Sequence, residues 1–262
     1  DNDYGANLPV RLKAWKEASY QEPKAESFQV TPGSNATTIK VTYRFPQTDA
    51  RWDITYKIYA SGVIKVDNRF VAEGDQAPMI PRVGLRMQLP ESFTDLTYYG
   101  RGPKENYRDR RTSQFIGEYA IPVKDMYEQY VRPQENNHRT DIYWCALTDK
   151  TQRGLLLIAD RTFELNASNY PLESMDSGDT IDNGAPRTEK THHRHLTDPL
   201  PEKMVDLFID YRMMGVGGDD SWGATAHEPY LIRPGKENAI EYGFSLVPFD
   251  KKEDYKYLIR QY

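Results

Sequence analysis

The sequence predicts an all-β domain, folded as a large antiparallel sandwich with few short helices. Apolar and polar residues alternate over several runs, turn signals separate these runs, and helical periodicity is sparse. Alternation with a period of two gives a strand one buried and one solvated face. A succession of such strands separated by turns favours a sandwich of two facing sheets.

The first half of the chain begins with one expected helix, over residues 10–19, which would place Leu12, Trp15 and Ala18 on one side. Alternating apolar residues then predict strands over residues 38–45, 52–58 and 83–89. Ser61-Gly62 lies between two alternating runs and predicts a hairpin turn.

The second half contains segments that are apolar without alternation. Residues 155–158 and 205–209 are of this kind, as expected for strands that are covered on both faces. Residues 242–247 predict a late strand and residues 254–260 a second short helix. The polar residues 174–195 predict a long surface loop.

The composition limits the class of protein. The net charge of −5 argues against general affinity for nucleic acid, and no apolar run approaches the roughly 18 residues of a membrane span. Cys145 is the only cysteine, which excludes an internal disulfide. No linker or internal repeat divides the chain, so we expect residues 1–262 to form one domain.

The chain starts at Asp1 without a methionine or a leader, which suggests a processed or excised piece of a longer protein. We expect residues 1–8 to be poorly ordered or held only by contacts with neighbours, because termini are mobile unless they are tied down.

Two glycine-rich segments with aromatic and charged neighbours, residues 98–110 and 215–222, are the main candidates for a functional site. Glycine allows backbone to approach backbone or ligand closely and permits positive φ. Trp222 follows a polar glycine loop, where its flat face could stack on a ligand. The alternative is a tryptophan that caps the edge of a core.

Other polar clusters favour structural roles. Two of them are interpreted as solvated loops rather than metal sites, namely His192, His193 and His195, and Asp176, Asp179 and Asp182. The histidines have no carboxylate or cysteine at ligand spacing, and the aspartates match a calcium loop only loosely. Ser221 does not match a nucleophile elbow, because Asp219 stands where that motif requires glycine.

Basic residues interleave with tyrosines in the first glycine-rich segment and just after it; they are Arg101, Lys104, Arg108, Arg110 and Arg111. Such a segment could bind nucleic acid by charge and stacking. A network that pairs the arginines with Glu105, Asp109 and Glu118 is the favoured alternative.

Glu105 and Glu135 could form the acid pair of a glycosidase, which must flank one bond. The arginines beside each glutamate (Arg101 and Arg108; Arg132 and Arg139) would instead stabilise the charged form. We therefore expect a structural role. Gly100, Gly102 and Pro103 would shape a turn, and Glu105 would pair with a nearby arginine.

Several longer motifs occur in one order along the chain. They are Asp1-Asn2-Asp3-x-Gly5, Arg82-Val83-Gly84-Leu85, Gly100-x-Gly-Pro-x-Glu-Asn-Tyr-x-Asp-Arg110, Tyr130-Val131-x-Pro133-x-Glu135-Asn136 and Gly215-x-Gly-Gly-Asp-Asp-Ser-Trp222. Together they resemble the C-terminal domain of large β-galactosidases of the glycoside hydrolase family 2 type. The resemblance covers essentially the whole chain.

This resemblance implies a galactose-mutarotase-like supersandwich of two large antiparallel sheets. It implies a parent enzyme that hydrolyses terminal β-galactosides with retention, through two glutamates and a divalent metal, Mg²⁺, in a preceding (β/α)₈ barrel. This chain would then hold no catalytic residue, metal or cofactor, and would be inactive by itself. Its partners would be the galactoside, the other domains of the same polypeptide and, in a homo-oligomer, further copies.

The resemblance also implies roles for particular residues. Trp222 would line the sugar site, and Asp3 and Gly5 would belong to a mobile loop beside it. Gly217 and Gly218 would let the second glycine-rich segment fold tightly, while Asp219 and Asp220 would hold it by accepting backbone N–H bonds.

Two other functions stay open at this point. One is an independent epimerase that acts on an anomeric carbon with a general acid and base. Its candidates would be His138, His195, Glu105 and Glu135. The other is a carbohydrate-binding or assembly module whose loops contact other domains.

Overall fold

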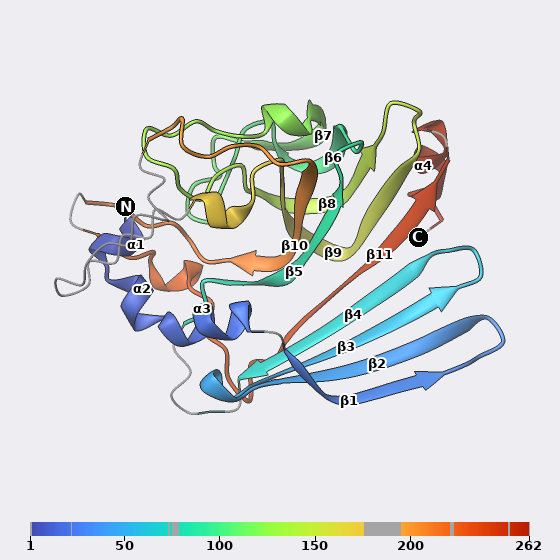
Figure 1. The fold of residues 1–262 in the computed structure, drawn as a ribbon, viewed down its shortest axis with the longest axis horizontal. Coiled ribbons are helices and arrows are strands. Elements are labelled where there is room, and N and C mark those ends of the chain that lie inside the picture. The colour runs from blue at the N-terminus through green and yellow to red at the C-terminus, as the bar shows by residue number, and fades with distance from the viewer. Residues whose placement is uncertain are drawn as a thin grey trace.

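A computed structural model describes residues 2–21, 23–72, 74, 79–175, 195–220, 223–250 and 252–261 (Figure 1). Antiparallel strands dominate these residues, which confirms the expected all-β class. Within these ranges, no helix has the length and apolar character that a membrane crossing requires.

The strands are β1 (Lys24–Thr31), β2 (Ala36–Phe45), β3 (Ala50–Tyr59), β4 (Ile64–Ala72), β5 (Arg82–Pro90), β6 (Asp95–Gly102), β7 (Phe115–Pro122), β8 (Arg139–Thr148), β9 (Gly154–Ser168), β10 (Met204–Met213) and β11 (Ile240–Phe249). The α-helices are α1 (Asn2–Gly5), α2 (Leu8–Arg11), α3 (Lys13–Tyr20) and α4 (Lys252–Leu258). Short 3₁₀ turns are η1 (Pro46–Thr48), η2 (Val123–Asp125), η3 (Leu172–Met175) and η5 (Glu228–Tyr230).

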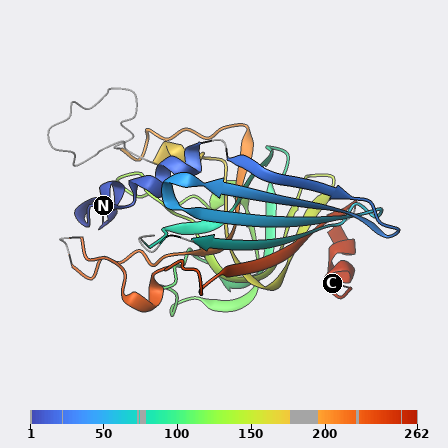
Figure 2. The same cartoon turned by 90° about the horizontal axis from the view of Figure 1, so that it is seen from below.

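The strands pair in the order β1-β2-β3-β4-β11-β9-β8-β6-β7, and β10 pairs with both β9 and β5. The long strand β9 joins two parts of the fold. Its first half pairs with β11, where Leu157 faces Leu246, and its second half pairs with β10, where Leu165 faces Ile209. Figure 1 shows β1–β4 below and β6–β8 above, and Figure 2 shows β1–β4 and β11 side by side in one layer.

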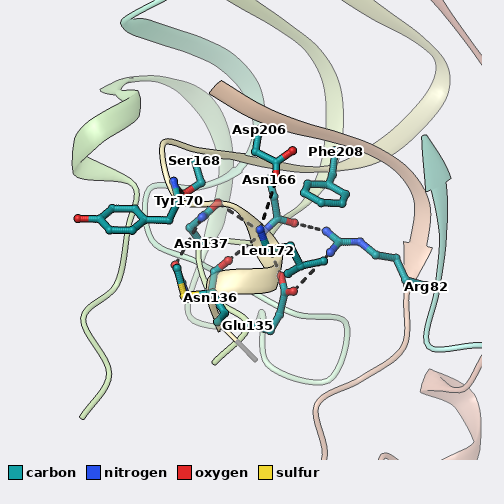
Figure 3. Close-up of a pocket in the computed structure, with 11 residues that line it drawn as sticks. Arg82, Glu135, Asn136, Asn137, Asn166, Ser168, Tyr170, Leu172, Asp206 and Phe208 are labelled. Atoms are coloured by element: carbon teal, nitrogen blue, oxygen red, sulfur yellow. Dashed lines mark hydrogen bonds and ion pairs between the residues drawn. The ribbon is translucent and has the colours of Figure 1, made fainter. Parts of the chain in front are cut away.

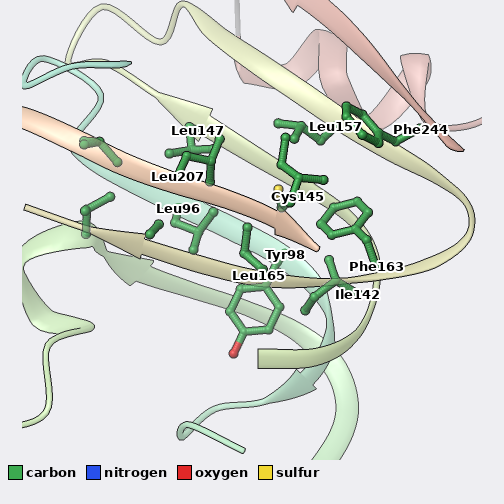
Figure 4. Close-up of a cluster of buried hydrophobic side chains, with 14 of the residues drawn as sticks. Leu96, Tyr98, Ile142, Cys145, Leu147, Leu157, Phe163, Leu165, Leu207 and Phe244 are labelled. Carbon is green, nitrogen blue, oxygen red and sulfur yellow. The ribbon is translucent and has the colours of Figure 1, made fainter. Parts of the chain in front are cut away.

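The main core fills the space between these layers (Figure 4). Ile54 of β3 and Val66 of β4 belong to the same buried cluster as Leu165 of β9 and Leu207 of β10. Burying one such aliphatic side chain contributes about 1.5–3 kcal/mol, so this cluster is a main source of stability.

Residues 155–158 are covered on both faces, as predicted. Leu157 faces the main core, while Leu156 and Ile158 pack with Tyr255 of α4 in a separate cluster. Residues 205–209 of β10 are also buried on both faces, as predicted, and alternate residues of the strand face the main core. Asp206, on the other face, is buried in a polar environment with an arginine partner.

The first helical prediction is correct in kind and wrong in extent. Residues 8–20 form two helices, α2 and α3, because the backbone at Leu12 leaves helical geometry with φ −111° and ψ 16°. Trp15 nevertheless packs against Phe70 with ring centroids 6.0 Å apart, so the expected apolar face is buried. The last helix is Lys252–Leu258 rather than residues 254–260.

The Ser61-Gly62 turn is confirmed between β3 and β4, and Gly62 has φ 86°. Gly100 and Gly102 do not shape a turn, because both lie in strand β6. A Cβ on Gly100 would lie 2.4 Å from Ile142 Cδ1. Close packing between strands therefore explains this glycine.

Candidate functional site

The glycine loop, residues 214–220, follows β10 and turns back on itself. Gly217 and Gly218 have φ of 63° and 85°, in the left-handed region that glycine adopts without strain. Gly218 N donates to Ala224 O at 2.9 Å, which closes the loop around residues 219–223. Ser221 and Trp222 lie outside the described residues. The chain is described up to Asp220 and again from Gly223.

The two aspartates of the loop have different roles. Asp220 Oδ1 accepts a hydrogen bond from Ala224 N at 3.1 Å, which agrees with its predicted role. Asp219 pairs instead with the exposed His227 through its side chain. Among the described residues, Asp219 accepts no backbone N–H bond, and its carboxylate is bonded to the imidazole of His227 instead.

A third aspartate, Asp109, has the role that was expected of Asp219. Its two carboxylate oxygens accept hydrogen bonds from Val216 N at 3.0 Å and Gly217 N at 2.8 Å. Arg110 next to it donates to Gly217 O at 2.5 Å. Sequence reasoning placed Asp109 in an arginine network and missed this function. The resemblance includes both glycine-rich motifs, residues 100–110 and 215–222, and this was the available signal that the two segments are in contact.

The N-terminal segment contacts the same loop. Asn2 Nδ2 donates to Val216 O at 3.1 Å, and a Cβ on Gly223 would lie 2.3 Å from the carbonyl carbon of Gly5. Asp3 and Gly5 lie in helix α1 rather than in an irregular loop, and both are exposed. The structure thus brings Gly5 against the residue that follows Trp222, and motion of this segment remains a prediction.

A buried polar cluster around Glu164 and His138 holds the end of β10, directly before the glycine loop. Glu164 accepts hydrogen bonds from Met213 N at 2.7 Å and from Arg108 Nη1 at 3.3 Å, and His138 Nε2 lies 3.0 Å from it. His138 Nδ1 lies 2.6 Å from Asn166 Oδ1. Burial alone would lower the pKa of His138, but hydrogen bonding and the charge of Glu164 outweigh burial and raise this pKa.

Beside this cluster lies a small pocket around Arg82 (Figure 3). Arg82 donates to Asp210 at 2.7 Å and to Asn166, and it pairs with Glu135 at 3.4 Å. Its guanidinium lies over the ring of Phe208, 4.3 Å from the centroid. Burial raises the pKa of Asp210 to about 6, although Arg82 favours the charged form.

This pocket has a free volume of only about 20 Å³, which is enough for one water molecule. Its main polar side chains are already bonded to one another. Among the described residues, no group of three or more His, Cys, Asp or Glu could hold a metal ion. The pocket is therefore a polar core that orders neighbouring segments.

Glu105 has no arginine among its hydrogen-bond partners in the described part of the chain, so that expectation is wrong. It accepts from Asn137 N at 2.7 Å and from the hydroxyl groups of Tyr130 and Tyr107. Glu135 pairs with Arg82 rather than with Arg132 or Arg139. Both glutamates thus join chain segments through several bonds, as expected of structural residues.

The arginines do form a network, but with other acids than expected. Arg101 and Arg111 both pair with Asp141 of β8, at 2.7 Å and 2.9 Å. Arg108 pairs with Glu164, and Glu118 pairs with Lys256. The acidic partners lie 30 or more residues away from these basic residues in the sequence. The prediction assigned acids that are close in sequence and was therefore wrong about the partners.

Three of the four residues proposed for an epimerase lie near one another: His138 and Glu135 both bond to Asn166, and Glu105 accepts from Asn137 N. His138 is completely buried and both ring nitrogens already face acceptors. His195 is exposed in a turn, where its backbone N donates to Asp198. His192, His193 and the aspartates at 176, 179 and 182 lie outside the described residues.

A glycine loop, a short helix against it and a buried polar cluster beneath it lie at one end of an antiparallel sandwich. The sequence model of the beta-galactosidase small chain matches residues 1–246, and the chain belongs to this family.

Curated relatives are β-galactosidases. The enzyme of Priestia megaterium (strain DSM 319 / IMG 1521) is 32% identical over 232 residues, which cover 88% of this chain and 21% of the relative. That of Lactobacillus delbrueckii subsp. bulgaricus is 31% identical over 234 residues, covering 88% and 21%. The chain thus spans about a fifth of the length of these relatives.

Similar solved structures are more remote. The galactosidase domain of the α-galactosidase–sucrose kinase AgaSK has a TM-score of 0.45 and 8% identity, covering 87% of this chain and 28% of that one. The GalM/aldose epimerase homologue from C. elegans has a TM-score of 0.40 and 9% identity, covering 86% and 69%.

Proposed function

We propose that this chain is the non-catalytic C-terminal domain of a retaining β-galactosidase of the glycoside hydrolase family 2 type. It completes a sugar site to which a (β/α)₈ barrel elsewhere in the polypeptide contributes the catalytic groups. Trp222 is the residue of this chain that contacts the galactoside. Its indole offers a flat apolar face to the sugar or its leaving group.

One observation carries this proposal. Gly5, from the segment assigned to the active-site loop, packs against Gly223, directly after Trp222. These residues are more than 200 positions apart, yet the fold places them in contact. A hydrogen bond from Asn2 to Val216 joins the same two segments. Two segments with separate predicted roles in one sugar site are thus in contact with each other, which supports the proposal.

The rest of the polypeptide supplies what this chain does not. The β-galactosidase relatives are about five times longer than the matched region, which leaves room for a catalytic barrel. We expect that barrel to hold the two catalytic glutamates and a divalent metal such as Mg²⁺. The partners of this domain are then the other domains and the β-galactoside, with further copies in a homo-oligomer.

An epimerase is not favoured, because His138, the candidate histidine that lies near the two candidate glutamates, is inaccessible. His138 is completely buried, and its two ring nitrogens are bonded to Glu164 and Asn166. A general base must reach the proton that it abstracts.

Kinetics of the complete enzyme test the proposal. Trp222→Ala removes one stacking face and should weaken binding of an aryl β-galactoside by about 1–3 kcal/mol, roughly 5- to 150-fold in KM. Trp222→Phe should recover part of the loss. Tyr257→Ala is the matched control, because Tyr257 is an exposed aromatic residue on α4. Unchanged kinetics for Trp222→Ala would remove this domain from the sugar site.

A further inference from the structure

Strand β1 forms one edge of the sandwich, and its apolar side chains are exposed. Among the described strands, β1 pairs only with β2, so the backbone N–H and C=O groups along its other side have no strand partner there. Phe28 is 65% exposed and Val30 is 48% exposed. Unpaired backbone groups beside exposed apolar side chains are what another strand can add to.

Exposure falls steeply from β1 into the sheet. Phe28 lies opposite Val41 of β2, and Val41 lies opposite Ile54 of β3, a residue of the main core. Residues that lie opposite one another share a face of the sheet. Val41 and Ile54 are only 5% and 4% exposed. Phe28 therefore lies on the core side of the sheet, beyond the part of this face that the described residues cover.

The layer across the core also ends in an edge strand. Among the described strands, β5 pairs only with β10, and Figure 1 shows β5 above the layer of β1–β4. Leu207 of β10 is fully buried, whereas Met87, opposite it in β5, is half-buried at the margin of the main core. A sandwich buries the inner faces of both its sheets. Here both inner faces lose cover at their edge strands.

The second half of β1 lacks the features that protect an edge strand from pairing, which are charges, proline and bulges. The first half has them, with Lys24, Glu26 and a register shift between Ala25 and Ser27. Residues 27–31, Ser-Phe-Gln-Val-Thr, contain no charge, no proline and no such shift. An edge strand of this kind is normally paired or covered.

We propose that the free edge of β1 takes an extended segment from the rest of the polypeptide, which pairs with the backbone of residues 27–31 and covers Phe28 and Val30. Such a segment carries apolar side chains at alternate positions, because only every second side chain faces the core. This inference rests on the part of the proposed function that makes the chain one domain of a longer polypeptide. It does not require the sugar site.

The polypeptide itself is a better source of this segment than a second copy. The chain covers 21% of the β-galactosidases of Priestia megaterium and Lactobacillus delbrueckii, so most of such a polypeptide lies outside it. A tethered segment has a high effective concentration at the edge, whereas a second copy binds only at the concentration of the protein.

Hydrogen exchange of the complete enzyme, read by mass spectrometry in peptides covering β1, tests the pairing. Only alternate N–H groups of an antiparallel edge strand bond to its neighbour, so about half of the amides of residues 27–31 exchange rapidly at a free edge. We expect all of them to be protected as well as those of β3, which has neighbours on both sides. Rapid exchange of about half of them would overturn the inference.

A photoreactive benzophenone amino acid at position 28 of the complete enzyme identifies the occupant. Illumination should link it to a segment of the same polypeptide outside residues 1–262, with apolar residues at alternate positions. The matched control is position 40, an exposed site on the other face of β2, which should not link to that segment. A product of doubled mass, linked to a second copy, would overturn the inference, as would links confined to residues 1–262.

Phe28→Asp tests whether the apolar side chain is part of the contact. A docked segment would bury this charge without a partner, so exchange of the β1 amides should rise roughly tenfold or more while β3 is unchanged. Gln29→Asp is the matched control, because it adds the same charge on the other face, opposite Lys40. If Phe28→Asp also disturbs β3, the milder Val30→Thr replaces it. Exchange of β1 equal to that of Gln29→Asp would overturn the inference.

These measurements fail independently of the proposed sugar site. If β1 is protected and linked as expected but Trp222→Ala leaves the kinetics unchanged, the sugar site is refuted and the inference stands. If Trp222→Ala raises KM while β1 exchanges as a free edge, the inference alone is refuted.

Discussion

Asp141 offers the clearest test of how the segment carrying Asp109 is held. It lies in β8 with φ 57°, a left-handed conformation that aspartate and asparagine tolerate better than most residues. Its carboxylate pairs with Arg101 and Arg111, which flank that segment. One side chain therefore fixes both ends of residues 101–111 to the sheet.

The magnitudes follow from these two features. The three side chains are about a quarter exposed, so solvent weakens the ion pairs, and we expect Asp141→Asn to cost about 1–3 kcal/mol of unfolding free energy. Asp141→Ala loses the same bonds and places alanine in a left-handed conformation, which costs about 1 kcal/mol more. The expected order of stability is wild type, then Asn, then Ala.

Urea unfolding of the chain at pH 7 measures this order, with the exposed Asp125→Asn as a control. Burial raises the pKa of Asp141, but Arg101 and Arg111 outweigh it and lower this pKa overall. A lowered carboxyl pKa stabilises the fold above the ordinary pKa, and this contribution is lost as the pH falls through the lowered value. The difference between wild type and Asp141→Asn should therefore shrink in acid. Equal stability of the Asn variant and the wild type at pH 7 would refute the ion-pair argument, and equal stability of Asn and Ala would refute the backbone argument.

Three further predictions concern single residues and the isolated chain. The purified chain should not cleave an aryl β-galactoside; turnover that disappears on mutating Glu105 or Glu135 would contradict its assignment as a non-catalytic domain. Glu105→Gln should lower stability by about 1–3 kcal/mol, because the amide cannot accept all the bonds from Asn137 N and the tyrosine hydroxyl groups. An unchanged melting temperature, combined with loss of activity in the complete enzyme, would give Glu105 a catalytic role instead. The raised pKa of His138 means that its stabilising contribution is complete below about pH 6.5 and is lost as the pH rises through the raised value. Melting temperatures between pH 5.5 and 8.5 should decline less for His138→Gln than for wild type, and parallel curves would show that His138 does not titrate in this range.

Strands with one buried face could be predicted from sequence, and others could not. Residues 38–45 and 52–58 alternate because β2 and β3 face the core on one side. Strand β1 carries no such pattern, since all its residues are exposed. Strand β6 was not predicted, because Gly100 and Gly102 resemble a turn signal in the sequence. In the structure both glycines lie in the strand, where neighbouring side chains pack closely against them.

The candidate site shows the same division. The glycine loop itself was visible in the sequence, because consecutive glycines predict an unusual backbone. Its anchor was not, because Asp109 and Gly217 are 108 residues apart and no local pattern links them. Asp109 has arginines on both sides, which made an ion pair seem its natural role.

The most direct test of the central claim is a crystal structure of the complete enzyme with bound galactose. The account predicts that the Trp222 indole lies face-on against the sugar or its aglycone side. It also predicts that the glycine loop is held by Asp109 and that α1 is beside it. A Trp222 indole packed in the interior of this domain, or distant from the sugar, would contradict the claim that the domain completes the sugar site.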